Sequence, residues 1–227
     1  MRDLRPLGLP CLIVDDGSNR ETQNALEDVA KRFSWITVKR RQTNGGRGAA
    51  LKTGYQLADQ LGFTHVLQVD ADGQHDPAAI PFLLSAAEKS PESLVLGAPI
   101  FDRTAPRVRL LGRRISIACV WLETFSRTIR DPLCGLRCMP LGSTLRVLHQ
   151  SRCGNHMEFD TEIAVRLVWS GVPTINVPVN VRYYKDGVSH FAMVRDNVRI
   201  SWLHSRLLAR ALFEWLALIM RSRGEES

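Results

Sequence analysis

Long apolar runs, cysteine clusters and low-complexity segments are all missing from this sequence of 227 residues. Its longest apolar stretch, residues 211–220, is interrupted by Glu214 and reaches only half of the ~20 residues that a membrane-spanning helix requires. The five cysteines are scattered, include no CxxC pair and follow no signal peptide, which argues against a disulfide framework and indicates a reduced, cytoplasmic protein. With 44% hydrophobic and 23% charged residues, fibrous and disordered classes are excluded as well.

Positive charge is what the sequence has in excess. Thirty Lys and Arg against 23 Asp and Glu give a net charge of +7. This balance favours an anionic partner, which could be nucleic acid, a phosphorylated ligand or an acidic membrane surface. The length favours one domain with a full hydrophobic core.

Short apolar runs alternate with helical patterns in the first half of the chain. The runs cover residues 11–15, 35–38, 65–70 and 94–96, and the helical segments cover 21–33, 48–61 and 77–89. Apolar strands separated by helices predict a doubly wound α/β fold, with a mainly parallel sheet covered by helices on both faces. Ligands of such sheets bind beyond the carboxyl ends of the strands, and two of the predicted strands run into acidic pairs there.

The second half has a different pattern. Apolar residues recur every three or four positions from Val108 to Ile129, which predicts an amphipathic helix whose first turns are rich in arginine. A short helix is expected from Phe159, with Asp160 in its first turn, followed by a strand over 174–181 and a final helix. We expect residues 1–200 to form the main domain and residues 201–227 an amphipathic C-terminal helix.

One acidic pair lies in the segment Asp70-Ala-Asp72-Gly-Gln74-His75. The two carboxylates, with the Gln74 carbonyl as a further oxygen, could converge on a hard cation whose remaining ligands are phosphate oxygens. The alternative is a solvated turn that caps the helix at Pro77. The segment alone leaves both interpretations open.

Two other segments suit a nucleotide. Asp15, Asp16 and Gly17 end a predicted strand, where a carboxylate can accept a hydrogen bond from a base or a ribose; the alternative is a turn that caps the next helix. Residues 44–51 place small residues and Arg47 at a helix start, which suits a diphosphate bound to backbone N–H groups. A glycine-rich helix start without a ligand is the alternative there.

Together, in this order and spacing, the segments resemble the family 2 glycosyltransferases of the GT-A fold, and especially the polyprenyl-phosphate (dolichol-phosphate) sugar synthase branch. The family's VDDGS, N-x-G-[KR]-G-x-A-L and D-A-D-[GL]-Q-H-[DP]-P motifs match residues 14–18, 44–51 and 70–77. Residues 131–137, 159–162 and 185–190 resemble its D-P-x-S-G-F-R, F-D-x-E and R-x-x-G-x-S-K segments. The resemblance covers residues 10 to about 200.

The sequence departs from the family pattern in three places. The family opens with a strand and a P-x-Y-N-[EH] motif before VDDGS, whereas this chain starts ten residues before Cys11. We therefore expect a start assigned too late or a truncation, and an exposed sheet edge at residues 11–15. Cys134 replaces the motif's Ser, and His190 replaces its Lys.

The resemblance implies an inverting, metal-dependent transfer of a sugar from a nucleoside diphosphate sugar to a polyprenyl phosphate or another hydroxyl acceptor. It implies Mg²⁺ or Mn²⁺ at Asp70, Asp72 and Gln74, with nucleotide contacts from Asp15, Asp16, Gly17, Arg47 and Asp70. Asp160 would be the catalytic base for a hydroxyl acceptor, whereas a phosphate acceptor needs no base. The acceptor would be bound by Arg103, Arg113, Arg114, Arg137, Lys185 and His190, since arginine suits bidentate phosphate contacts.

Two alternatives to this activity remain: a truncated, inactive relative, and a non-catalytic module that binds nucleotide or nucleic acid. No helix-turn-helix, zinc-finger or aromatic RNA-binding signature occurs, so we expect no nucleic-acid partner.

The C-terminal segment carries apolar residues at helical spacing, together with arginines and two tryptophans. The apolar residues are Leu203, Leu207, Leu208, Ala211, Leu212, Leu218 and Ile219; the tryptophans are Trp202 and Trp215. This pattern predicts a helix lying on an anionic membrane surface, at the inner face of the cytoplasmic membrane. Packing on the core or on a second subunit is the alternative.

Overall fold

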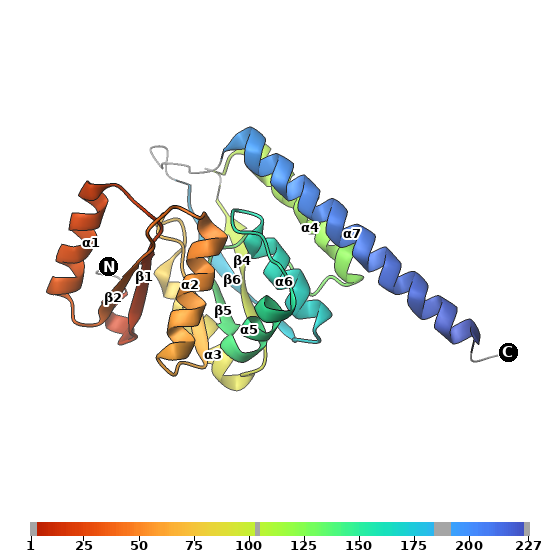
Figure 1. The fold of residues 1–227 in the computed structure, drawn as a ribbon, viewed down its shortest axis with the longest axis horizontal. Helices are drawn as coiled ribbons and strands as arrows, with labels where there is room; N and C mark the ends of the chain where they lie inside the picture. The colour runs from red at the N-terminus through yellow and green to blue at the C-terminus, as the bar shows by residue number, and fades with distance from the viewer. Residues whose placement is uncertain (1–3, 103–104, 184–191, 225–227) are drawn as a thin grey trace.

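The computed structural model describes residues 4–102, 105–183 and 192–224, with side chains up to Trp215, and has an α/β architecture (Figure 1). The strands are β1 (Cys11–Asp15), β2 (Ile36–Arg40), β3 (His65–Gln68), β4 (Leu94–Phe101), β5 (Arg137–Pro140) and β6 (Thr174–Val181). The α-helices are α1 (Arg20–Arg32), α2 (Arg47–Gln60), α3 (Ile80–Lys89), α4 (Arg107–Thr124), α5 (Leu141–Gln150), α6 (Phe159–Trp169) and α7 (Met193–Gly224). Short 3₁₀ turns lie at Arg5–Leu7 and Pro77–Ala79.

The strands form two sheets. Strands β1 and β2 are parallel, and the second sheet has the order β3-β5-β4-β6. Strands β4 and β6 are parallel, whereas β5 runs antiparallel to both of its neighbours. The α/β class and the predicted strands are confirmed. The sheet is more mixed than expected because the short segment Arg137–Pro140, which has no strand-like alternation, forms β5 at the centre of the larger sheet.

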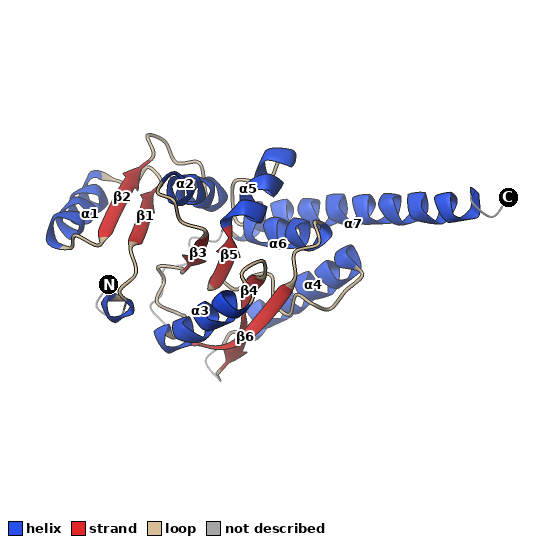
Figure 2. Cartoon of the chain, turned by 90° about the horizontal axis from the view of Figure 1, so that it is seen from below, coloured by secondary structure: helices blue, strands red, loops and turns tan. Residues whose placement is uncertain are grey.

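Alternate residues of the central strand β4 face two separate cores, as the two-residue period of a strand requires. Leu94 and Leu96 belong to a cluster with side chains of α2, α5, α6 and α7. Val95 belongs to a second cluster with side chains of α3, β5 and β6. Helices therefore cover both faces of this sheet, as Figure 2 shows.

The first two strands are less enclosed than the rest. Among the described strands, β1 pairs only with β2, and its other edge faces β3 without hydrogen bonds between them (Figure 2). The side chains from Cys11 to Val14 are only half-buried, and α1 has no fully buried residue. Helix α2 contacts both β1 and β3 and so joins the two sheets.

The C-terminal helix begins earlier than expected. Helix α7 starts at Met193 and continues without a break across residue 200, so the expected domain boundary falls inside one helix. Leu203, Leu207 and Ala211 belong to the stripe predicted to face a membrane, but they are buried. In this part of α7 the stripe packs on the core, which is the alternative to membrane contact. Leu212 and Trp215 are exposed, and the side chains beyond Trp215 lie outside the described part of the chain.

Helices α4 and α7 lie side by side (Figure 1). A buried contact joins them, with 2.6 Å between His204 Nδ1 and Glu123 Oε1. Within the described residues, no helix has both the length and the apolarity needed to cross a bilayer.

Candidate active site

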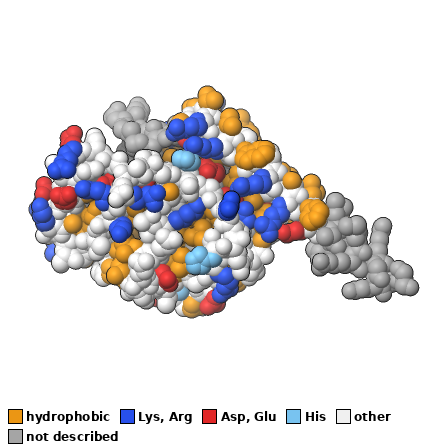
Figure 3. Space-filling view, in the orientation of Figure 1, with side chains coloured by type: hydrophobic (Ala, Val, Ile, Leu, Met, Phe, Trp, Pro, Cys, Tyr) orange, Lys and Arg blue, Asp and Glu red, His pale blue; other side chains and the backbone are white. Residues whose placement is uncertain are grey.

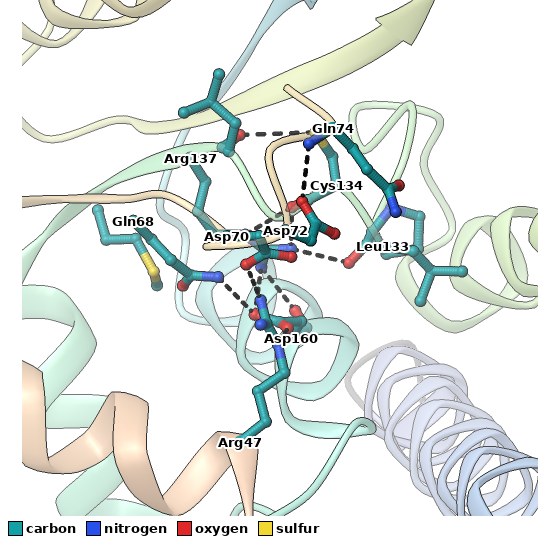
Figure 4. A network of polar contacts seen from close by, with 12 residues as sticks. Arg47, Gln68, Asp70, Asp72, Gln74, Leu133, Cys134, Arg137 and Asp160 are labelled. Carbon is teal, nitrogen blue, oxygen red and sulfur yellow. Dashed lines mark hydrogen bonds and ion pairs between the residues drawn. The ribbon is translucent and has the colours of Figure 1, made fainter. Parts of the chain in front are cut away.

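Arg47 links two acidic residues that are far apart in the sequence. It is the first residue of α2, while Asp70 follows β3 and Asp160 lies in the first turn of α6. Arg47 Nη2 donates to Asp70 Oδ1 at 2.5 Å, and its Nε donates to Asp160 Oδ2 at 2.6 Å (Figure 4). Although burial alone would lower its pKa, the two carboxylates raise it, so Arg47 stays a cation. The structure thus places one fixed positive charge beside the acidic loop.

Asp160 is buried, and several protein groups hold it. Its Oδ1 accepts from Gln68 Nε2 at 3.0 Å, and the Tyr55 hydroxyl donates to Gln68 Oε1 at 2.7 Å. Burial by itself would raise the pKa of Asp160, but the charges of Arg137 and Arg47 outweigh it, and the pKa is lowered. A carboxylate with both oxygens bound and a lowered pKa is a poor proton acceptor. In this geometry Asp160 holds Arg47 in place, and its expected role as the base stays a prediction.

Arg137 does not have the exposure that acceptor binding requires. Its side chain is fully buried, and its guanidinium donates to the backbone carbonyls of Pro132, Cys134 and Asp160. The expected direct contact with an acceptor is therefore corrected: Arg137 ties the loop before β5 to the start of α6 and supplies a charge behind Asp160.

Asp72 and Gln74 lie on the acidic loop after β3. Asp72 is exposed, and its Oδ1 accepts from the backbone N–H of Gln74 at 3.0 Å. Asp70 lies against Gly135, where an added Cβ would be 1.9 Å from Asp70 Oδ2, so only glycine leaves room for this carboxylate. In the described part of the chain no cluster of three or more His, Cys, Asp or Glu forms a closed metal cage. The exposed carboxylate of Asp72 and the partly exposed one of Asp70 fit a cation of the Mg²⁺ type, which one or two carboxylates bind together with substrate phosphates and water.

Asp15 and Asp16 bind protein groups at the end of β1. Asp16 accepts from the backbone N–H groups of Gly45 and Gly46, at 3.0 Å and 2.7 Å, and from Arg41 Nε at 2.7 Å. Asp15 accepts from the backbone N–H of Ser18, and this contact, with Arg40, lowers its pKa despite burial. The two carboxylates therefore shape the loops on which a nucleotide could lie.

Glycine is required at the turn that follows. Gly17 has a φ of 71°, and a Cβ there would be 2.6 Å from the backbone nitrogen of Asn44. The turn after β1 and the glycine-rich loop before α2 are therefore in direct backbone contact.

The predicted acceptor residues are only partly described. Arg113 Nη1 donates to Asp131 Oδ2 at 2.7 Å and lies over the Phe101 ring, while Arg114 is exposed. Arg103, Lys185 and His190 lie outside the described residues. Cys134 is buried, and burial raises the pKa of its thiol to about 11, so it stays protonated and serves packing.

Sequence reasoning missed the support behind Asp160. Gln68 is a polar residue inside the apolar run of β3, and buried polar groups need partners, so its position was a usable signal. Tyr55 had no such signal, because it occupies an ordinary apolar position of α2.

Comparisons with known proteins relate this chain to a sequence family and to several relatives. The sequence model of glycosyl transferase family 2 matches residues 5–151. An uncharacterised protein of Methanocaldococcus jannaschii is 26% identical over 201 residues, 84% of each chain. The polyprenol monophosphomannose synthase of Mycolicibacterium smegmatis is 26% identical over 196 residues, 83% of this chain and 71% of that one. The undecaprenyl-phosphate mannosyltransferase of Micrococcus luteus is 33% identical over 86 residues, 38% of this chain and 35% of that one.

Solved structures share the fold. Glucosyl-3-phosphoglycerate synthase from Mycobacterium tuberculosis, in complex with Mn²⁺ and uridine-diphosphate-glucose, matches with a TM-score of 0.59 at 18% identity. The match covers 85% of this chain and 67% of that one. The expected GT-A fold is confirmed.

Proposed function

The chain belongs to glycosyl transferase family 2 and is a glycosyltransferase, and from that premise we propose that it moves a sugar from a nucleoside diphosphate sugar to a polyprenyl phosphate, with inversion at the anomeric carbon. The observation that carries the proposal is the placement of Arg47 between Asp70 and Asp160. Two relatives named for polyprenol and undecaprenyl-phosphate substrates support the acceptor class.

The donor diphosphate would lie between the glycine-rich loop and the acidic loop. Asp16 accepts from the backbone N–H groups of Gly45 and Gly46 and so fixes the glycine-rich loop. Arg47 projects from the start of α2 toward Asp70 of the acidic loop. A fixed guanidinium there stabilises the negative charge that develops on the leaving diphosphate. Asp15, Asp16 and Gly17 would hold the nucleoside side of this donor.

Asp70 and Asp72 would hold the divalent cation, with the Gln74 oxygen as a further ligand. When bound, Mg²⁺ or Mn²⁺ neutralises charge on the diphosphate and so makes it a better leaving group. The Mn²⁺ complex of the related fold supports a cation of this kind.

The state of Asp160 favours a phosphate acceptor over a hydroxyl acceptor. A hydroxyl must lose a proton during attack, and Asp160 is held by Arg47 and Gln68. A phosphate oxygen is already ionised and needs no base. Arg113 and Arg114 would bind this phosphate, together with Arg103, Lys185 and His190 as expected from the sequence. The enzyme would work at the inner face of the cytoplasmic membrane, in peripheral contact with an anionic surface.

Nucleotide binding followed by melting temperature tests the donor and metal parts of this proposal. Uridine and guanosine diphosphates should raise the melting temperature in the presence of Mn²⁺ and much less in EDTA. Asp72→Asn should lose the effect of the metal, while Asp59→Asn, at an exposed position on α2, should keep it. Equal stabilisation with and without Mn²⁺ would contradict the metal site, and no stabilisation by any nucleoside diphosphate would contradict the donor site.

A further inference from the structure

The loop that leads into α6 packs on the start of α2. We call residues 153–158 the lead-in loop. The carbonyl of Asn155 accepts from the backbone N–H of Ala49 at 3.0 Å. A Cβ at Gly48 would be 2.5 Å from the Cβ of Phe159, the first residue of α6, so only glycine lets the two segments come this close. The lead-in loop therefore belongs to the surroundings of the proposed donor site.

His156 lies in this loop with its ring against the turn before α2. A Cβ at Gly46 would collide with Nδ1 of the ring, and Gly46 immediately precedes Arg47. The side chain is only half-buried. Across the described part of the chain, no hydrogen bond or ion pair joins the ring to another residue. The imidazole is therefore free to bind a ligand beside Arg47.

Contacts from two directions hold the backbone that carries this ring. The backbone N–H of His156 donates to Oε1 of Glu158, which is buried, at 3.2 Å. On the other side, Nζ of Lys52 in α2 donates to the carbonyl of Cys153 at 2.6 Å and to Oδ1 of Asn155 at 2.8 Å. Because the loop is already fixed, the imidazole would need little reordering to meet a ligand.

Most backbone donors around the start of α2 are already bound to protein groups. Asp16 accepts from the N–H groups of the two glycines before Arg47, and the N–H of Ala49 donates to the lead-in loop. Arg47 itself contacts two carboxylates. A diphosphate at this helix start would therefore need a further donor from a side chain, and the ring of His156 lies close by.

We propose that His156 is a further donor-binding residue, whose ring N–H donates to an oxygen of the donor diphosphate. This deepens the proposed function and rests on its donor site. A neutral imidazole carries one N–H donor, and a hydrogen bond to an ionised phosphate oxygen is of the stronger, charge-assisted kind. Figure 3 shows Lys and Arg side chains spread between α1 and α7 on the face drawn there, and positive charge of this kind attracts an anionic ligand.

Nuclear magnetic resonance of the histidine rings tests the contact directly. Full-length protein with ¹⁵N-labelled histidine is titrated with uridine diphosphate, guanosine diphosphate and inorganic pyrophosphate, in the presence of Mg²⁺. The spectrum of His156→Gln identifies the signals of this ring. We expect them to move with each nucleoside diphosphate that raises the melting temperature. The signals of His149, at an exposed position on α5, should stay in place.

Substitution at His156 should weaken donor binding without disturbing the fold. His156→Ala should bind nucleoside diphosphate at least about tenfold more weakly, the change expected for the loss of one hydrogen bond to a charged group. His156→Gln keeps an N–H donor and should recover part of the affinity, while His149→Ala is the matched control and should bind as wild type does. In steady-state assays the KM for the donor should rise and the KM for polyprenyl phosphate should not, a split that a general loss of structure would not produce.

Three results would overturn the inference while leaving the donor site in place. These are ring signals of His156 that do not move when a nucleoside diphosphate raises the melting temperature, a His156→Ala variant that binds as tightly as wild type, and ring signals that respond only to nucleoside diphosphate sugars, which would place the ring at the sugar. If no nucleoside diphosphate stabilises the wild-type protein, the donor site of the proposed function is rejected, and this inference with it.

Discussion

At the scale of single residues, the site depends on one guanidinium that contacts two carboxylates at once. Arg47 uses Nε for Asp160 and Nη2 for Asp70, two N–H donors that the planar guanidinium holds at a fixed separation, whereas lysine carries all its donors on one nitrogen. The charge that would meet the donor diphosphate is therefore also an orienting contact between α2, α6 and the acidic loop.

Arg47→Lys should keep the fold and lose most of the activity. Lysine keeps the charge, but its donors share one nitrogen and do not reproduce the two separated contacts in the same geometry, and loss of one oriented donor typically costs about 10²–10³ in rate. Steady-state rates for the variant, compared with those for Arg146→Lys at an exposed position on α5, measure this effect. A variant with more than half of the wild-type rate would show that the bridge is not used.

Asp160→Asn should destabilise the protein in a pH-dependent way. Removing one charge from a buried pair typically costs about 3–5 kcal/mol, because Arg137 and Arg47 are left without their counter-charge. Since the pKa of Asp160 is lowered on folding, its contribution is fully present above the unfolded pKa of about 3.9 and is lost as the pH falls through the lower folded value. Urea unfolding should therefore show a large difference between variant and wild type at pH 7 that shrinks toward pH 3. A difference that stays constant over this range would contradict the charge assignment.

Gly135→Ala should disturb the acidic loop without unfolding the chain. The new methyl group would overlap Asp70 Oδ2, so the Asp70 carboxylate must leave its position against residue 135. We expect Mn²⁺-dependent nucleotide binding to weaken by at least about tenfold, or 1.4 kcal/mol. Gly142→Ala is the matched control, since a Cβ there meets nothing within 4 Å. Equal binding by the two variants would remove Asp70 from the metal site.

At the scale of elements, the chain divides into a well-packed sheet and a weakly enclosed pair of strands. Strands β4 and β6 pair over eight positions between two core clusters, whereas β1 pairs with β2 over five and keeps an unpaired edge among the described strands. Local stability should follow this difference. Amide hydrogen exchange should be faster in Ile13 and Val38 than in Val95 and Val177, and equal protection would show that the two sheets unfold as one unit.

The elements also show what a sequence can predict. Strands β1, β3 and β6 and helices α2 and α6 follow from apolar periodicity and were found close to their observed bounds. Strand β5 was missed because its four residues carry no pattern of their own and pair only through neighbours distant in sequence. The acidic residues of the candidate site come from motifs in the sequence, whereas the burial of Arg137 and the exposure of Trp202 depend on which side of an element meets the core. Periodicity predicts that a helix has an apolar side. When two sides of a helix carry apolar residues, as in α7, it does not predict which of them packs on the core.

At the scale of the whole molecule, the candidate active site and the helix pair α4 and α7 lie on connected elements. Helix α6 carries Asp160 and, through Glu162, holds Arg206 of α7 at 2.6 Å. Helix α4 carries Arg113, which donates to Asp131, and packs on α7. Helices α4 and α7 are thus joined by these contacts to the helix that carries Asp160.

Transfer of an isotopically labelled sugar to polyprenyl phosphate is the most direct test of the central claim. Purified full-length protein is incubated with nucleoside diphosphate sugars and polyprenyl phosphate, with Mn²⁺ or with EDTA, and the lipid extract is measured by mass spectrometry. The account predicts a glycosyl polyprenyl phosphate that forms with Mn²⁺, is absent in EDTA and is absent for Asp72→Asn. Full turnover in EDTA, or no labelled lipid from any donor with Mn²⁺ present, would contradict it.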